Sequence, residues 1–148
     1  MNYKQEKNNK LEKVISKTIS AFLNSKNGGV LLICEETGNF LLGERAKNVP
    51  FSDCWSLFGG GIDEGESVLE GVKRELMEEP QIPSNDIRYE LFEMQYNIGD
   101  PYYFYLGYCD KQYECKLNEE TQRCGWFDLN NLPKPLFPTL YSSLVRIF

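Results

Sequence analysis

Four glutamates lie close together along one stretch of the chain and have the chemistry of metal ligands. Glu75, Glu78 and Glu79 are three and four positions apart, so a helix would place them at neighbouring positions on its surface. Ser67 begins a capping-box pattern, which predicts that this helix starts just after it. Glu66 precedes the helix and can approach the same region from the loop.

Three glutamates at this spacing near the end of a helix destabilise it. They are therefore not expected in a helix that has only a structural role. Like charges at this spacing repel by roughly 0.2–0.5 kcal/mol per pair, and the helix dipole disfavours anions at its C-terminal end by about 0.3–1 kcal/mol each. Oxygen ligands without histidine or thiolate favour Mg²⁺, with Mn²⁺ or Ca²⁺ as alternatives. A solvated acidic helix end is the competing interpretation. Glycines at positions 59–61 and 65 favour the metal site, because they let the backbone approach a ligand closely.

The composition narrows the chemistry further. The chain of 148 residues contains no histidine, so carboxylates must serve both as metal ligands and as general bases. A net charge of −6 argues against nonspecific binding of nucleic acid. An anionic phosphate substrate would therefore need a cation as intermediary, and the 5′ end of an RNA held through a metal is the one nucleic-acid alternative.

The segment from Phe58 to Ile82 resembles the Nudix box, G-x5-E-x7-R-E-U-x-E-E-x-G-U, in which U is a bulky aliphatic residue. The matching positions fall in register: Gly60, Glu66, Arg74, Glu75, Leu76, Glu78, Glu79 and Ile82. A hairpin expected before the box and a strand around Trp126 after it are also similar to the family. The resemblance therefore covers roughly residues 28–130.

The resemblance implies an α/β fold, an α/β/α sandwich with a mixed central sheet. It also implies hydrolysis, dependent on Mg²⁺ or alternatively Mn²⁺, of a pyrophosphate linkage in a small nucleoside diphosphate derivative, such as a nucleoside triphosphate or a nucleotide sugar. Water would attack phosphorus. A catalytically weak nucleotide-binding module and an RNA 5′-end pyrophosphohydrolase are the alternatives. The oligomeric state stays open, a homodimer included.

The family pattern assigns roles to the box residues of this chain. The backbone at Gly60 would lie beside the metal, and that of Gly61 would approach phosphate. Glu78 would be a candidate for the general base, which differs between family members, and Arg74 would orient a glutamate rather than touch substrate. The metal ligands implied by the resemblance are Glu66, Glu75, Glu78 and Glu79.

A carboxylate outside the box is a further candidate, since one helix face cannot surround an ion. Glu120 lies six residues before Trp126, about where many Nudix enzymes carry an acid that approaches the metals. We predict that Glu120 acts as a base or ligand, with Glu119 as the second candidate. Two solvated loop carboxylates are the alternative.

Aromatic residues outside the glutamate cluster are candidates for stacking a nucleobase. Residues 102, 104, 106 and 108 alternate with 103, 105 and 107 along one predicted strand, so one set faces the core and the other is free to meet a ligand. The predicted substrate contacts are Trp55, Phe58 and Tyr103, and sheet packing is the competing role for each.

Two positions depart from the family pattern. Phe58 stands where many members have proline, and Pro80-Gln81 replaces the pair whose glycine ends the helix. Proline disfavours helical geometry in the preceding residue and cannot donate to the carbonyl of Leu76. We therefore expect the helix to end at or before Glu79, Glu79 to leave helical geometry, and Gln81 to avoid positive φ.

Hydrophobic periodicity organises the rest of the chain. An amphipathic helix is expected over residues 9–24, packed on the flank of the domain, with a membrane or partner contact as the alternative. Strands are expected at residues 30–34, 40–42, 87–96, 102–108 and 124–129, and a helix at 140–147. We expect residues 1–27 to carry the flanking helix and residues 28–148 to form one Nudix-like domain.

The cysteines and the apolar pattern bear on location. Five cysteines, an odd number with no C-x-x-C pair, predict free thiols in a reducing compartment. The chain lacks an apolar run of about 18 residues, and its lysine-rich N-terminus lacks the apolar region of a secretory signal. We therefore expect a cytoplasmic protein with no membrane partner.

Overall fold

The computed structural model describes residues 3–23, 26–83, 85–97 and 100–148. Its helices are α1 (Tyr3–Leu23), α2 (Val68–Glu78) and α3 (Leu140–Ile147). Its strands are β1 (Asn27–Cys34), β2 (Phe40–Arg45), β3 (Trp55–Ser56), β4 (Phe58–Gly61), β5 (Arg88–Asn97), β6 (Asp100–Cys109) and β7 (Thr121–Phe127).

The strands form one mixed sheet that forks beside β1. β1 runs parallel to β6, and the other strand pairs are antiparallel. The first half of β1 pairs with β4, whereas its end meets β2 at Ile33 opposite Phe40. β2 then pairs with β3 and β7. The two branches therefore separate on the side of β1 that faces away from β6.

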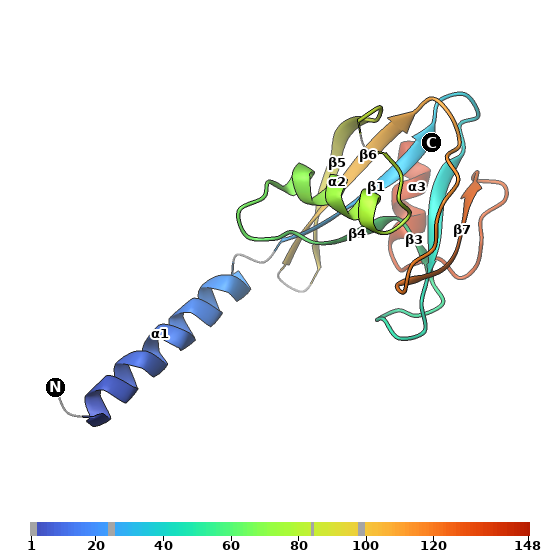
Figure 1. The fold of residues 1–148 in the computed structure, drawn as a ribbon. Helices are drawn as coiled ribbons and strands as arrows, with labels where there is room; N and C mark the ends of the chain where they lie inside the picture. Colours follow the sequence, from blue (N-terminus) through green and yellow to red (C-terminus); the bar gives the residue numbers. More distant parts are fainter. Residues whose placement is uncertain (1–2, 24–25, 84, 98–99) are drawn as a thin grey trace.

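Alternation along β1 produces three layers. Val30, Leu32 and Cys34 pack in one apolar cluster with α2, whereas Leu31 and Ile33 pack in a second cluster with α3. Because successive side chains of a strand point to opposite faces, a strand that is apolar throughout needs a cover on both faces. Figure 1 shows α2 on one face of the sheet and α3 on the other. The predicted α/β/α sandwich with a mixed sheet is confirmed.

The start of α2 follows from local sequence. Ser67 Oγ accepts a hydrogen bond from the Glu70 backbone N–H at 3.1 Å, and Glu70 Oε2 accepts one from the Ser67 N–H at 2.8 Å. Both halves of the capping box are present, so two of the otherwise unpaired N–H groups at the helix start are satisfied. The predicted start of the helix after Ser67 is confirmed.

Strand β4 occupies residues that the sequence suggested were part of a glycine loop. Glycine has low strand propensity because it has no side chain to pack and loses much backbone entropy. The ladder with β1, which pairs Gly28 with Gly60 and Gly29 with Gly59, supplies the missing stabilisation. Pairing with β1, which is a tertiary contact, therefore determines that residues 58–61 form a strand.

Helix α1 begins earlier than expected and differs in its packing. It starts at Tyr3, and the described side chains from residue 4 to 16 are exposed, including Leu11 at 57% and Ile15 at 49%. The expected packing on the flank of the domain is therefore not found for these residues, and the helix projects away from the sheet (Figure 1). Among the described helices, none is both long and apolar enough to cross a membrane.

The C-terminal end of α2 corrects two expectations. The helix ends at Glu78, as predicted, but Glu79 keeps helical φ and ψ of −80° and −79°, with its N–H bonded to the Glu75 carbonyl at 2.9 Å. The expectation that Gln81 avoids positive φ is wrong, because its φ is 58°. This left-handed residue turns the chain back so that the Ile82 N–H reaches the Leu76 carbonyl at 3.1 Å. The Ile82 N–H therefore supplies the Leu76 carbonyl with the hydrogen-bond donor that Pro80 cannot provide.

The backbone at Gln81 yields a stability prediction. A branched side chain in the left-handed region costs about 1–2 kcal/mol, whereas glycine adopts that region freely. Gln81→Val should therefore lower the free energy of unfolding by about 1–2 kcal/mol relative to Gln81→Gly. Urea denaturation followed by circular dichroism measures both variants, and equal stabilities would contradict the assigned conformation.

The cysteines also depart from expectation. Cys115 and Cys124 form a disulfide with a Cα–Cα distance of 6.4 Å, whereas Cys34, Cys54 and Cys109 are free. The loop before β7 is held beside that strand by a hydrogen bond from Trp126 Nε1 to the Tyr113 carbonyl, at 3.0 Å. This contact brings the two cysteines within bonding range although their spacing matches no motif. The prediction that all five cysteines are free thiols is wrong for this pair.

A thiol count tests the disulfide. Denatured but unreduced protein should be alkylated at three cysteines, and reduced protein at all five. Intact mass spectrometry after alkylation distinguishes the two numbers. Five labelled cysteines without reductant would show that the pair does not form.

Candidate active site

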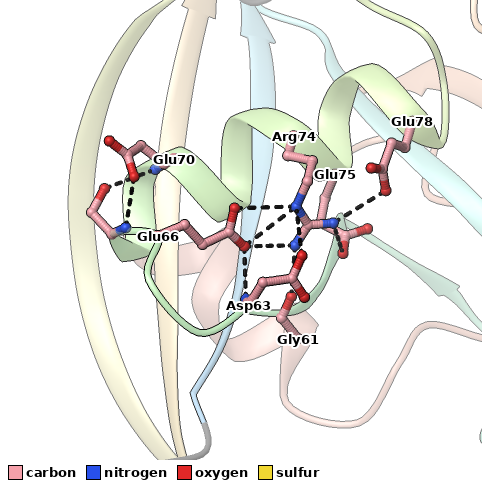
Figure 2. Close-up of polar contacts among 8 residues, drawn as sticks. Gly61, Asp63, Glu66, Glu70, Arg74, Glu75 and Glu78 are labelled. Carbon is pink, nitrogen blue, oxygen red and sulfur yellow. Dashed lines mark hydrogen bonds and ion pairs between the residues drawn. The ribbon is translucent and has the colours of Figure 1, made fainter.

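Arg74 is the centre of a charged cluster on α2. Its guanidinium donates to Glu66 Oε1 at 2.7 Å, to Glu75 Oε1 at 3.1 Å and to Glu78 Oε2 at 3.1 Å. It also donates to the Gly61 carbonyl at 3.0 Å. Figure 2 shows the guanidinium between Glu66 on one side and Glu75 and Glu78 on the other. One cation therefore neutralises three carboxylates that would otherwise repel one another.

Glu66 is tied to this cluster from the loop before α2. Arg74 and the Asp63 backbone N–H, which lies 2.7 Å from Glu66 Oε1, both donate to the carboxylate. These hydrogen bonds, that from Arg74 first, lower the pKa of Glu66. Glu66 is therefore a fixed anion at neutral pH, and the loop between β4 and α2 is anchored through it.

Glu79 lies on the other side of the helix end, in a different environment. Only 7% of the residue is exposed, and burial raises the pKa of its carboxyl group well above the usual value. A hydrogen bond with Glu75 and the nearby charge of Glu120 raise this pKa further, while Arg45 opposes the shift. Glu79 is therefore protonated at neutral pH, which removes its repulsion with the neighbouring carboxylates.

Gly60 completes the environment of this pair. A Cβ atom at Gly60 would lie 2.7 Å from Glu75 Oε1, so any side chain there would displace the carboxylate. The backbone of β4 thus packs directly against the glutamates of α2. The glycine is required by this close approach rather than by an unusual φ angle.

The donor set fits a hard divalent cation. Glu79 carries a proton that a cation would replace, and the charge of Glu120 acts on Glu79 from a separate loop. Within the described part of the chain, however, no three acidic or cysteine side chains already converge as one metal group. The contacts of Arg74 with Glu75 and Glu78 account for this, because they turn these carboxylates toward the guanidinium.

A cavity of about 530 Å³ opens beside the cluster, within the usual size range for small-ligand sites. Glu120 and Arg45 line it together with the glycine backbone of β4, and Tyr102 and Phe104 of β6 line its wall. Glu119 is not among its lining residues. Of the two predicted loop carboxylates, the structure therefore brings Glu120 to the candidate site.

The predicted substrate contacts lie in less favourable places. Trp55 is 6% exposed and packs edge-on against Phe127 at 5.2 Å between ring centroids, so it belongs to the core. Phe58 is 3% exposed and borders a small cavity near Glu79 and Glu120. Tyr103 does not line the large cavity, and neither does Gly61, whose carbonyl accepts from Arg74. The geometry favours Tyr102 over Tyr103 as a ligand contact, because Tyr102 lines the cavity and is not part of the fully buried core.

Several cavity residues had no motif to reveal them. Tyr102 and Phe104 belong to one of the two alternating sets of β6, and the sheet register alone selects that set. Arg45 ends β2 and reaches the site only because the sheet forks beside β1. Gln95 and Ser143 come from β5 and α3, which the chain brings together across about fifty residues.

The chain is similar to known proteins in both sequence and fold. The family model of the NUDIX domain matches residues 25–146. The ADP-ribose pyrophosphatase of Methanocaldococcus jannaschii is 32% identical over 118 residues, which cover 71% of this chain and 63% of that protein. The oxidized purine nucleoside triphosphate hydrolase of Mus musculus is 30% identical over 82 residues, which cover 53% of this chain and 52% of that protein.

A solved structure agrees with these relatives. The MutT NUDIX hydrolase of Burkholderia pseudomallei superposes with a TM-score of 0.68 at 27% identity, covering 82% of this chain and 96% of that one. This chain spans only 63% and 52% of the lengths of the two curated relatives. The family model nevertheless matches most of the residues that build the sheet, the box and the cavity. The chain belongs to the NUDIX family.

Proposed function

We propose that this protein hydrolyses a pyrophosphate linkage in a small nucleoside diphosphate derivative, using Mg²⁺ or Mn²⁺. One observation carries the proposal. The buried Glu79 contacts the half-buried Glu75 and is acted on by the charge of Glu120, and Glu120 and Arg45 line a cavity of about 530 Å³. Hard anionic ligands and a cationic side chain thus meet where a diphosphate needs both.

The roles of the chain's own residues follow from their positions. Glu75, Glu78, Glu79 and Glu66 are the proposed metal ligands, and the bound cation would join carboxylate to phosphate and lower the pKa of the attacking water. Arg74 positions the glutamates, because it contacts three of them. Arg45 is the proposed phosphate contact, since it is a cationic residue that lines the cavity.

Two carboxylates are candidates for accepting the proton of the attacking water. Glu78 has a side chain that is 57% exposed, so it can turn from Arg74 toward substrate at little cost. Glu120 lines the cavity and acts on Glu79 electrostatically, which places it on the substrate side of the pair. A general base must lie within hydrogen-bonding reach of the water; the contact of Glu78 with Arg74 and the place of Glu120 in the cavity wall support the two candidates.

The relatives suggest the first substrates to test. ADP-ribose comes first, because the Methanocaldococcus relative is named as its pyrophosphatase, and oxidised purine nucleoside triphosphates come second. Nucleotide sugars, dinucleoside polyphosphates and capped RNA complete the panel. A nucleotide-binding module without hydrolysis is the second candidate function, motivated by Pro80 and Gln81 at the end of the box.

Metal removal and one substitution test the mechanism. Hydrolysis should disappear with chelator and return with Mg²⁺ or Mn²⁺, and Glu78→Gln should reduce kcat at least about 100-fold, the scale of losing an acid–base or ligand group. Phosphate or nucleotide release measures both, and Glu36→Gln, in an exposed turn, is the matched control. Full activity without metal would contradict the metal-dependent mechanism. Nucleotide binding without turnover would favour the binding module.

A second pair of variants separates the two candidate bases. Under saturating Mg²⁺, Glu120→Gln should lower kcat by roughly 10- to 100-fold, whereas Glu119→Gln should have little effect, because only Glu120 lines the cavity. Steady-state kinetics with the best substrate of the panel gives both values. Unchanged turnover in the Glu120→Gln variant would leave Glu78 as the base.

A further inference from the structure

A second group of polar residues lines the same cavity, away from the Nudix box. Gln95 of β5 and Ser143 of α3 both face it. Behind them, Arg146 donates to Glu93 through two hydrogen bonds, at 2.7 Å and 2.8 Å. This bidentate pair joins α3 to β5 and fixes one wall of the cavity.

The ion pair determines the orientation of the Gln95 amide. Its hydrogen bonds lower the pKa of Glu93 to about 2, chiefly through Arg146, so Glu93 is an anion that only accepts. Gln95 Nε2 lies 2.6 Å from Glu93 Oε1 and 3.2 Å from Ser143 Oγ. The amide NH₂ must face the carboxylate, because the opposite orientation would place two acceptors in contact.

The consequence is an acceptor with a fixed position. Among the described residues, no donor reaches Gln95 Oε1, while both Nε2 protons have partners. The single proton of the Ser143 hydroxyl is directed at Glu93 Oε1 or the Thr139 carbonyl, at 3.3 Å and 3.5 Å. The polar group that this wall offers to a ligand is therefore the carbonyl oxygen of Gln95.

The neighbouring walls are aromatic. Tyr102 and Phe104 line the cavity from β6, and Phe137 and Phe51 line it from two loops, with their rings 4.8 Å apart. Flat aromatic surfaces beside an oriented acceptor match a planar base that carries an N–H group.

We propose that Gln95 is a specificity-determining residue that accepts a hydrogen bond from the exocyclic amino group of an adenine base. This inference rests on the proposed function, since it assigns the base side of the same cavity. Purine nucleotides that bear a 6-amino group are then the preferred substrate class. A base without any N–H leaves the Gln95 oxygen without its partner, and an unpaired buried acceptor weakens binding.

Binding of uncharged nucleosides tests this without metal or turnover. Adenosine and purine riboside, which lacks only the amino group, are titrated in EDTA and followed by ligand-observed NMR. The wild-type protein should bind adenosine about tenfold more tightly, the scale of one lost hydrogen bond. In Gln95→Met, which keeps the side-chain length, the ratio should fall close to one. Gln112→Met, on an exposed loop outside the cavity, is the matched control and should keep the wild-type ratio.

A second variant tests the orienting role of Glu93. In Glu93→Gln, the anion that fixes the Gln95 amide is removed, so the amide can turn its NH₂ to the cavity. Selectivity should then shift toward inosine, whose 6-oxo group accepts a hydrogen bond. Thermal melts confirm that the variant is folded, and a purely structural role for Glu93 would weaken both nucleosides equally.

The outcomes separate this inference from the proposed function. Equal affinity for adenosine and purine riboside, selectivity that survives Gln95→Met, or no adenosine binding at millimolar concentration would each overturn it. Selective binding without hydrolysis of any substrate would remove the proposed function and leave the Gln95 assignment standing. Hydrolysis with no base selectivity would support the proposed function and overturn the Gln95 assignment.

Discussion

Repulsion among carboxylates is the constraint on which the candidate site depends. Glutamates at the C-terminal half of α2 oppose both one another and the helix dipole, yet all are held within one cluster. Arg74 relieves part of the repulsion by contacting three of them. Glu79, for which no contact with Arg74 is found among the described residues, is accommodated because burial and the hydrogen bond with Glu75 raise its pKa, so that it is protonated at neutral pH. Arg74 therefore offsets the charge in one part of the cluster, and protonation of Glu79 removes the charge in the other part.

Close backbone packing keeps these parts together. A Cβ at Gly59 would lie 2.2 Å from the Gly28 carbonyl oxygen, and one at Gly60 would meet Glu75. The glycines thus let β4 approach β1 on one side and α2 on the other. Once β4 is in this position, the Gly61 carbonyl accepts from Arg74, which links the sheet to the charged cluster. The strand ladder and the ion-pair network stabilise the same segment.

The two faces of the forked sheet carry different groups of side chains. On the α2 face, the helix carries the glutamates, and the glycine backbone of β4 packs against them. On the α3 face, β5, β6 and α3 form the wall of a cavity with aromatic rings and an oriented amide. Arg45 and Glu120 lie where the branches separate and therefore connect the acidic cluster to the ligand space. The proposed binding of the base and the proposed chemistry thus fall on different layers, so we expect substitutions to alter one with limited effect on the other.

The sequence alone was enough for features that depend on neighbours along the chain. The capping box placed the start of α2, alternation and turn residues placed the hairpins, and glutamate spacing with the box resemblance located the acidic cluster and the family. Local rules also located the end of α2 but misjudged its geometry, because the need to satisfy the Leu76 carbonyl forced Gln81 into positive φ.

Features that depend on distant partners were decided only by the tertiary structure. The β4 ladder overrides the low strand propensity of glycine, and the Cys115–Cys124 bond needs a loop packed beside β7. The parallel register of β1 and β6 selects Tyr102 rather than Tyr103 for the cavity. Gln95 acquires its orientation from an ion pair with a helix about fifty residues away. A sequence pattern reports periodicity, but which face of a strand meets a ligand is fixed by what packs against the other face.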